Sequence, residues 1–209
     1  MNPYYPIMLR LEGKKALVVG GGKVAERKVT GLLEAGAIIT VISPDVTEGL
    51  RLLANEGKVI WQPKEFSPSD VKDALLIFAA TSDKRANRLV KASAQPHQLV
   101  TMADGLDTSD FHVPSKLKRG QLIIAVSTGG ASPTLARRIR AMLEEQFDPS
   151  YEDYLEFLFS KRLWILKNVE EASLKRKLLT AIASKVFLTS CKREEDFMKI
   201  YNDLIEADS

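Results

Sequence analysis

The sequence predicts an α/β protein, with a parallel sheet in the N-terminal half, a small α/β segment after it and a helical C-terminal part. Short apolar runs rich in β-branched residues alternate with helical segments as far as residue 102. A glycine-rich turn separates the first run from the first helix, and from residue 151 apolar residues recur at helical spacing. Alternating strands and helices favour a parallel sheet with helices on its faces.

The N-terminal elements follow from hydrophobic periodicity and from turn residues. Residues 16–20 predict a strand buried on both faces, residues 24–34 predict a helix that stops at Gly36, and residues 38–42 predict a second strand. Further strands are expected at residues 59–61, 75–80 and 99–102, and further helices at 46–54, 69–74 and 84–94. Strands joined in this way need right-handed crossovers, so they are predicted to run parallel.

Beyond residue 113 the alternation ends. Residues 116–120 lead into a predicted strand at 122–126, and Ser132 is suited to cap a helix that begins at Pro133. About three helical segments are expected from residue 151 to the end. The predicted domains are residues 1–113, 114–148 and 149–209.

Composition limits the classes of function. The 209 residues carry a formal net charge of +3, too small an excess of basic side chains to indicate a nucleic-acid partner. No apolar run approaches the roughly 20 residues that span a bilayer, and the N-terminus lacks the features of a secretory signal, so we expect no membrane partner and a cytoplasmic location. Cys191 is the only cysteine, which excludes an intrachain disulfide, and we expect it to be a partly buried small residue.

Residues 20–25, Gly-Gly-Gly-Lys-Val-Ala, carry the clearest functional signal. They match G-x-G-x-x-A between a predicted strand and a predicted helix, which is the context of the Rossmann dinucleotide-binding fingerprint. Gly20 permits a tight turn, Gly22 lets a pyrophosphate approach the backbone, and Ala25 keeps the helix close to the strand. The N–H groups at the helix start, in the stretch that includes Lys23 and Val24, favour phosphate. A P-loop fits less well, because Val24 stands where that motif needs Ser or Thr.

The type of dinucleotide depends on the end of the second strand, which reads Ser43-Pro44-Asp45. No acidic residue occupies the last strand position, but Ser43 or Asp45 can accept hydrogen bonds from ribose hydroxyls. No arginine follows directly to bind a 2′-phosphate. We therefore favour NAD over NADP.

Three segments together resemble a known family. Residues 18–28 read VVGGGKVAERK, residues 79–83 read AATSD and residues 122–137 read LIIAVSTGGASPTLAR. They resemble the precorrin-2 dehydrogenases, which include the N-terminal half of bifunctional sirohaem synthases. The resemblance implies oxidation of precorrin-2 to sirohydrochlorin with NAD, in the biosynthesis of sirohaem. The biosynthesis of cobalamin is left open as a second pathway for the product. It also implies a homodimer with a Rossmann domain, a small dimerisation domain and a helical domain.

The resemblance also marks residues at the strand ends. Thr81 of the AATSD segment is a cofactor-binding candidate. Asp104 stands where the family carries an aspartate implicated in catalysis or metal handling, and a carboxylate at a strand end can accept a proton as hydride leaves. Asp104 is equally suited to cap a turn. His112 is a structural residue or, with Asp104, a metal-binding pair.

The implied substrate is a tetrapyrrole rich in carboxylates, so its site should supply anion donors. The segment before the helix at Pro133 offers hydroxyls and closely spaced backbone N–H groups, and basic side chains lie nearby in the sequence. The substrate-binding candidates are Ser127, Thr128, Gly129, Gly130, Ser132 and Arg137. We expect the macrocycle to bind between this segment and the edge of the Rossmann domain.

Two other functions compete with the dehydrogenase. One is a sirohydrochlorin ferrochelatase, alone or as a second activity, which inserts Fe²⁺ and depends on Asp104 or His112 to position the metal. The other is a binding module that senses NAD and reports to a partner through the helical tail. The sensor would bind NADH without turnover, and it leaves the anion-binding segment at residues 127–132 unexplained.

Overall fold

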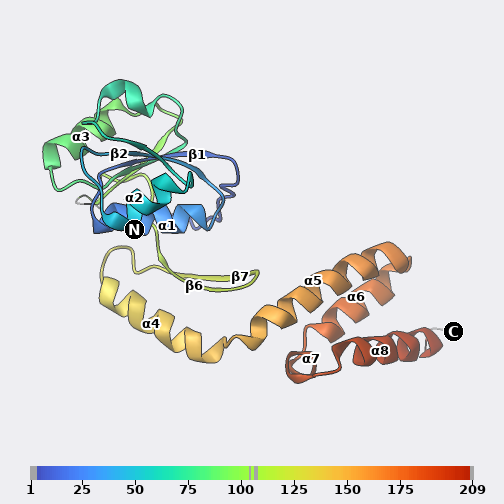
Figure 1. The fold of residues 1–209 in the computed structure, drawn as a ribbon. Coiled ribbons are helices and arrows are strands. Elements are labelled where there is room, and N and C mark those ends of the chain that lie inside the picture. Colours follow the sequence, from blue (N-terminus) through green and yellow to red (C-terminus); the bar gives the residue numbers. More distant parts are fainter. Residues whose placement is uncertain (1–3, 104, 106–107, 208–209) are drawn as a thin grey trace. The chain divides into compact units, whose positions relative to one another are not determined.

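The computed structural model describes residues 4–103, 105 and 108–207, and the chain forms two compact units, residues 1–113 and 114–209 (Figure 1). Each unit has its own apolar core. The division at residue 113 coincides with the point at which the strand and helix alternation of the sequence ends. Residues 114–209 group as one unit, and their further division near residue 149 stays a prediction.

The first unit is built on a five-stranded parallel sheet with the order β3-β2-β1-β4-β5. The strands are β1 (Lys15–Val19), β2 (Ile38–Ile42), β3 (Ile60–Gln62), β4 (Leu76–Ala79) and β5 (Leu99–Met102). The order reverses between β1 and β4, and open sheets of this kind bind ligands at the carboxyl ends of the strands beside that reversal. The predicted α/β fold class and parallel sheet are confirmed.

Helices cover both faces of this sheet. One face packs against α1 (Lys23–Leu33) and α2 (Glu48–Asn55), and the other packs against the 3-10 helix η1 (Pro68–Val71) and α3 (Lys84–Ser93). Val18 of β1 belongs to the first apolar layer, whereas its neighbours Leu17 and Val19 belong to the second. Alternate side chains therefore point to opposite layers, which explains why residues 16–19 of β1 are all apolar.

The second unit joins a hairpin to a row of helices. β6 (Ser115–Arg119) and β7 (Leu122–Val126) pair antiparallel, and α4 (Pro133–Gln146) packs against both strands. The helices that follow are α5 (Ser150–Asn168), α6 (Ala172–Ile182), α7 (Lys185–Thr189) and α8 (Arg193–Ala207). Their shared core is rich in aromatic side chains, including Phe157, Phe187 and Phe197. Among the described residues, no helix is long and apolar enough to cross a membrane.

Four details of the sequence prediction were wrong. Residues 115–119 are a strand of their own, because Leu117 is buried while Lys116 and Lys118 alternate with it on the exposed side, and the basic residues concealed that pattern. The helix expected at 69–74 is a short 3-10 turn. The described part of the tail contains four helices, since five-residue α7 is too short to show a period. Cys191 is exposed, because it lies in the turn between α7 and α8.

Candidate cofactor site

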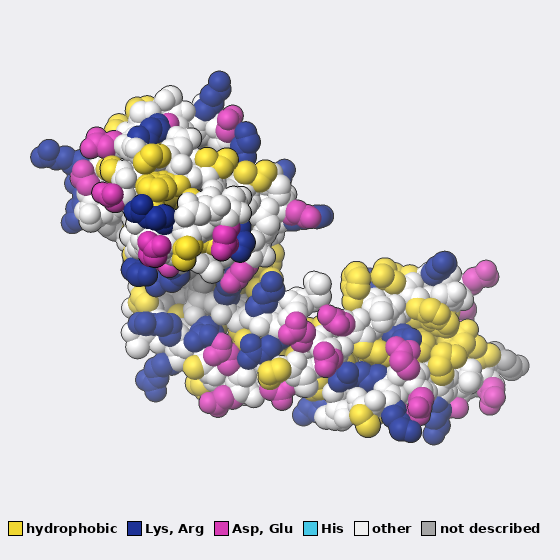
Figure 2. All heavy atoms as spheres, in the orientation of Figure 1, with side chains coloured by type: hydrophobic (Ala, Val, Ile, Leu, Met, Phe, Trp, Pro, Cys, Tyr) yellow, Lys and Arg dark blue, Asp and Glu magenta, His cyan; other side chains and the backbone are white. Residues whose placement is uncertain are grey.

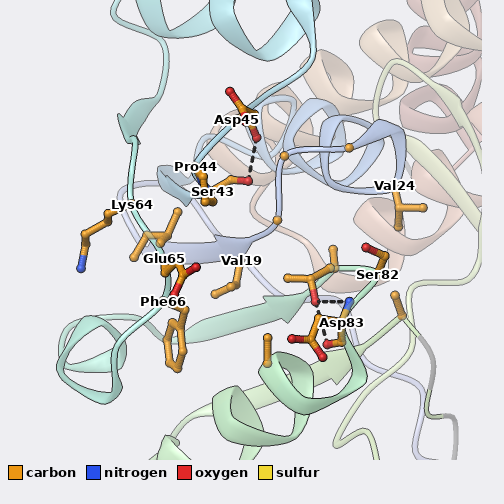
Figure 3. Close-up of a pocket in the computed structure, with 18 of the residues that line it drawn as sticks. Val19, Val24, Ser43, Pro44, Asp45, Lys64, Glu65, Phe66, Ser82 and Asp83 are labelled. Atoms are coloured by element: carbon orange, nitrogen blue, oxygen red, sulfur yellow. Dashed lines mark hydrogen bonds between the residues drawn. The ribbon is translucent and has the colours of Figure 1, made fainter.

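A pocket of about 820 Å³ lies at the carboxyl ends of the strands of the first unit (Figure 3). Its walls come from the turn between β1 and α1 and from the segments that follow β2, β3 and β4. The lining includes residues 19–24, 42–45, 64–66, 80–83 and Ala103. Among the predicted cofactor residues, Gly20, Gly22, Lys23, Val24, Ser43, Pro44, Asp45 and Thr81 line this pocket. Ala25 is fully buried below it and packs in the core between α1 and the sheet.

Two glycines let the first turn lie against neighbouring strand ends. Gly20 has φ of +120°, and a Cβ there would lie 2.4 Å from the carbonyl oxygen of Ala80, which follows β4. A Cβ on Gly21 would lie 1.9 Å from the carbonyl oxygen of Asp45, which follows β2. Gly21 occupies a free position of the fingerprint, so the motif gave no signal for it. The absence of side chains at both glycines lets the first turn lie against the segments that follow β2 and β4.

Gly22 has the opposite surroundings, because a Cβ there would meet no atom within 4 Å. It is the N-cap of α1, and no side chain of the described residues caps this helix. By contrast, the side chains of Thr47, Asp83 and Ser132 cap α2, α3 and α4. The first N–H groups of α1 therefore face open space with the positive end of the helix dipole, which suits a pyrophosphate group. Because the uncapped N-terminus of α1 lines it, the pocket fits a dinucleotide.

The segment after β2 is held by its own hydrogen bonds. The Ser43 hydroxyl donates to the Asp45 carbonyl oxygen at 2.7 Å, and the Trp61 indole donates to the Ser43 carbonyl oxygen at 3.0 Å. Figure 3 shows the Asp45 carbonyl turned toward Ser43 and its carboxylate turned away. The Ser43 oxygen keeps lone pairs that can accept from a ribose hydroxyl.

Asn87 fixes the segment after β4, although no sequence motif marks this residue. Its buried side chain accepts from the Thr81 N–H at 3.2 Å and donates to the Thr81 carbonyl oxygen at 3.1 Å. The Thr81 hydroxyl lies 2.8 Å from Asn87 Oδ1 and 2.9 Å from the Asp83 carbonyl oxygen. A lone asparagine inside a predicted helix was the available signal, because asparagine is a poor helix former.

The segment after β3 was missed as well. Lys64 forms an ion pair with Asp70 at 2.5 Å, and Asp70 also accepts from the Ser67 N–H at 2.8 Å. Partial burial acts to raise the pKa of Asp70, but the hydrogen bonds from Lys64 and Ser67 hold it below its ordinary value. Figure 3 shows the Glu65 carboxylate directed toward the middle of the pocket, above the Phe66 ring. Nothing in the motif pointed to this loop.

Asp104 lies outside the described residues, but its surroundings at the end of β5 are described. Ala103 lines the pocket, and its N–H donates to the Ala79 carbonyl oxygen at 2.9 Å. The chain then folds back, so that Asp110 accepts from the Val100 N–H at 2.8 Å and pairs with Lys91. The proposed role of Asp104 stays a prediction.

His112 has a partner that the metal hypothesis did not anticipate. Its Nε2 lies 2.5 Å from the Tyr4 hydroxyl, and the two rings meet edge to face with centroids 4.6 Å apart. In the described part of the chain there is no cluster of three or more potential metal ligands. The pairing of His112 with Asp104 around a metal stays a prediction.

The predicted substrate segment lies in the second unit, between β7 and α4. Gly129 and Gly130 have φ of +61° and +88°. The hydroxyl oxygen of Ser127 accepts from the Gly129 N–H at 3.2 Å, that of Thr128 from the Ser132 N–H at 3.1 Å, and that of Ser132 from the Leu135 N–H at 3.1 Å. Each oxygen is thus fixed as an acceptor while its own hydrogen stays available to donate. Donors of this kind suit carboxylates.

Basic side chains and apolar side chains are also exposed on the second unit. Arg137 lies on the first turns of α4, within 3.5 Å of the Thr134 hydroxyl, and Arg140 pairs with Glu144. Exposed apolar side chains cover part of the helical region (Figure 2). On α5 they include Phe159, Leu163 and Leu166, which lie at helical spacing along one side.

Comparisons with known proteins agree with this arrangement. Residues 7–115 match a family described as NAD(P)-binding, and residues 119–146 match the family "Sirohaem biosynthesis protein central". A precorrin-2 dehydrogenase from Priestia megaterium is 35% identical over 93% of this chain and 96% of its own length. A solved structure of SirC, a precorrin-2 dehydrogenase, superimposes with a TM-score of 0.84 at 34% identity, covering 96% of this chain and 100% of that one.

The siroheme synthases match over a shorter stretch. The protein from Nitrosococcus oceani is 45% identical over 71% of this chain but only 32% of its own length. This chain therefore spans about a third of the siroheme synthases that it matches.

Proposed function

Because this chain belongs to the family of the precorrin-2 dehydrogenases and the N-terminal regions of siroheme synthases, we propose that it oxidises precorrin-2 to sirohydrochlorin with NAD. The observation that carries the proposal is the pocket at the strand ends, with the uncapped N-terminus of α1 beside Gly22. Bound NAD supplies the acceptor for the hydride that leaves the macrocycle. The protein's task is to bind and orient both molecules.

Different residues of the pocket bind different parts of the dinucleotide. The first turn of α1, beside Gly22, binds the pyrophosphate, and Ser43 and Asp45 at the end of β2 receive the ribose. The Ser43-Pro44-Asp45 segment contains no basic residue that could bind a 2′-phosphate, which favours NAD over NADP. Lys64 lines the pocket, but its ammonium group is paired with Asp70.

The second unit supplies donors for a substrate rich in carboxylates. The hydroxyl oxygens of Ser127, Thr128 and Ser132 accept from backbone N–H groups, so each hydroxyl keeps its hydrogen free to donate to a carboxylate. Arg137 adds a positive charge one helical turn further along α4. We assign precorrin-2 side-chain carboxylates to this segment.

Asp104 is the proposed proton acceptor. It follows Ala103, which lines the cofactor pocket, and a carboxylate at this end of the sheet can take the proton that leaves the ring system as hydride is transferred.

A homodimer is part of the same proposal. The predicted dimerisation segment, residues 114–148, exposes the apolar side chains of Ile123, Leu135 and Met142, which are of the kind that subunit interfaces cover. Measurement of the molecular mass in solution by light scattering tests it, with twice the mass of the chain expected.

The test of the reaction is anaerobic absorbance after the protein is mixed with precorrin-2 and NAD in the absence of metal. Appearance of the NADH band together with the sirohydrochlorin bands is expected, and replacement of NAD by NADP should slow both. Binding of NADH without any change in the tetrapyrrole bands would favour the sensor. Addition of Fe²⁺ afterwards tests the chelatase, and metal insertion that needs no NAD would establish it.

A further inference from the structure

We propose that Glu65 recognises the 6-amino group of the cofactor's adenine, so that the pocket reads the base as well as the phosphates. This inference rests on the proposed function, because it assigns a residue to the dinucleotide site. Glu65 lies outside the glycine fingerprint and outside the ribose segment.

The sheet order places Glu65 where the base should lie. The ribose segment follows β2, and β3 is the next strand outward, since the order is β3-β2-β1. Neighbouring strands lie about 4.8 Å apart, so the loop after β3 lies one strand beyond the ribose and away from the β1 turn. A dinucleotide that runs from Gly22 past Ser43 therefore brings its adenine to the loop that carries Glu65.

The loop around Glu65 is fixed while Glu65 itself is free. Lys64 pairs with Asp70 at 2.5 Å, and the Lys64 N–H donates to the Gln62 carbonyl oxygen at 2.9 Å. Phe66 packs against the apolar layer below α3. Among the described residues, none forms a hydrogen bond or ion pair with the Glu65 carboxylate, which points toward the middle of the pocket (Figure 3). The two neighbours thus hold the backbone and leave this carboxylate for a ligand.

Its chemistry selects one kind of base. An ionised carboxylate only accepts hydrogen bonds, and the 6-amino group of adenine only donates them. In a purine with a carbonyl oxygen at position 6, that oxygen would face the Glu65 carboxylate. Both groups are acceptors, so the hydrogen bond is lost and the two oxygens repel each other. Adenine is therefore favoured over hypoxanthine at the same place.

Calorimetry with two dinucleotides tests this assignment through binding alone. We would titrate the wild-type protein, Glu65→Gln and the control Glu56→Gln with NAD and with nicotinamide hypoxanthine dinucleotide. Glu56 is exposed after α2 and pairs only with nearby Lys58 among the described residues, away from the pocket lining. We expect the wild type and the control to bind NAD about tenfold more tightly than the hypoxanthine compound. Glu65→Gln, whose amide can also donate, should lose most of that ratio.

Two results would overturn the assignment without touching the proposed function. One is equal binding of both dinucleotides by the wild type. The other is an unchanged ratio of the two affinities in Glu65→Gln. Failure of the wild type to bind either dinucleotide would overturn the proposed function and this inference together.

Discussion

The turn between β1 and α1 and the loop between β7 and α4 both place glycines before a helix, yet they prepare different surroundings for an anion. Gly22 leaves the N-terminus of α1 uncapped and open. Ser132 caps α4, and the hydroxyls of Ser127 and Thr128 are held by backbone N–H groups. The first arrangement offers bare N–H groups to a phosphate, and the second offers hydroxyl hydrogens to carboxylates. The anion that a glycine-rich segment before a helix can bind therefore depends on whether a side chain already accepts from the first N–H groups of that helix.

The largest expected effect comes from Gly22→Asp. Gly22 has extended backbone angles that any residue can adopt, and aspartate is a favourable N-cap, so the fold should keep or gain stability. The same carboxylate would fill the open space and repel the pyrophosphate, and we expect affinity for NAD to fall at least about hundredfold. Calorimetry and urea unfolding measure the two changes, and Gly22→Ala is the matched control with a smaller loss of binding. A stability loss equal to the binding loss would contradict this explanation.

Gly20→Ala should act mainly on the fold. The backbone at φ of +120° disfavours any Cβ, and this one would lie 2.4 Å from the Ala80 carbonyl oxygen. We expect a loss of about 3 kcal/mol in the free energy of unfolding, measured in urea. Gly57→Ala is the control, because Gly57 has a φ of +69° but no atom within 4 Å of the added Cβ. An equal loss in both variants would mean that the contact with Ala80 is unimportant.

Asn87→Ala should weaken both stability and cofactor binding. Removal of the buried Asn87 amide leaves the half-buried Thr81 N–H and carbonyl groups without this partner. We expect about 2 kcal/mol of lost stability and a several-fold rise in the dissociation constant of NAD. Asn202→Ala, at an exposed position of α8, should change neither quantity. Wild-type affinity for NAD in Asn87→Ala would show that the Thr81 segment does not need this support.

Thr128→Val should distinguish the role of the loop between β7 and α4 from that of the turn between β1 and α1. The change removes a hydroxyl of the second unit and keeps the shape of the side chain. We expect the KM for precorrin-2 to rise about fivefold, with the dissociation constant of NAD unchanged. Steady-state kinetics and calorimetry give the two values, and Thr180→Val on α6 serves as the control. A weaker affinity for NAD in Thr128→Val would contradict the proposal that one loop binds the substrate and the other binds the cofactor.

The smallest expected effect is the pH dependence of the stability that Asp110 contributes. Partial burial acts to raise the pKa of Asp110, but Lys91 and the Val100 N–H together hold it below its ordinary value, so its contribution to stability is complete above the unfolded pKa of about 3.9. That contribution is lost as the pH falls through the lower folded pKa. Asp110→Asn should cost about 0.5–1 kcal/mol at pH 6, since the pair is partly exposed, and the difference from the wild type should shrink toward pH 3. Urea midpoints at several pH values measure it, and a difference that grows in acid would reverse the assigned sign.

The sequence predicted the parallel sheet and the glycine-rich turn after its first strand, because both depend on local patterns. Apolar strands between helices identified the parallel sheet, and spacing alone marked Gly20 and Gly22. Asn87 and Glu65 escaped prediction because their roles depend on which segments the strand order brings beside the turn. β6 escaped because Lys116 and Lys118 alternate with only one buried side chain, Leu117.

The most direct test is a comparison of the wild type with Gly22→Asp in anaerobic mixtures of precorrin-2 and NAD without metal. We predict that, at an NAD concentration near the wild-type dissociation constant, the wild type forms NADH and sirohydrochlorin in equal amounts, and that the folded variant forms both about fiftyfold more slowly. Sirohydrochlorin formation by Gly22→Asp at the wild-type rate would contradict the assignment of the uncapped helix end to the cofactor.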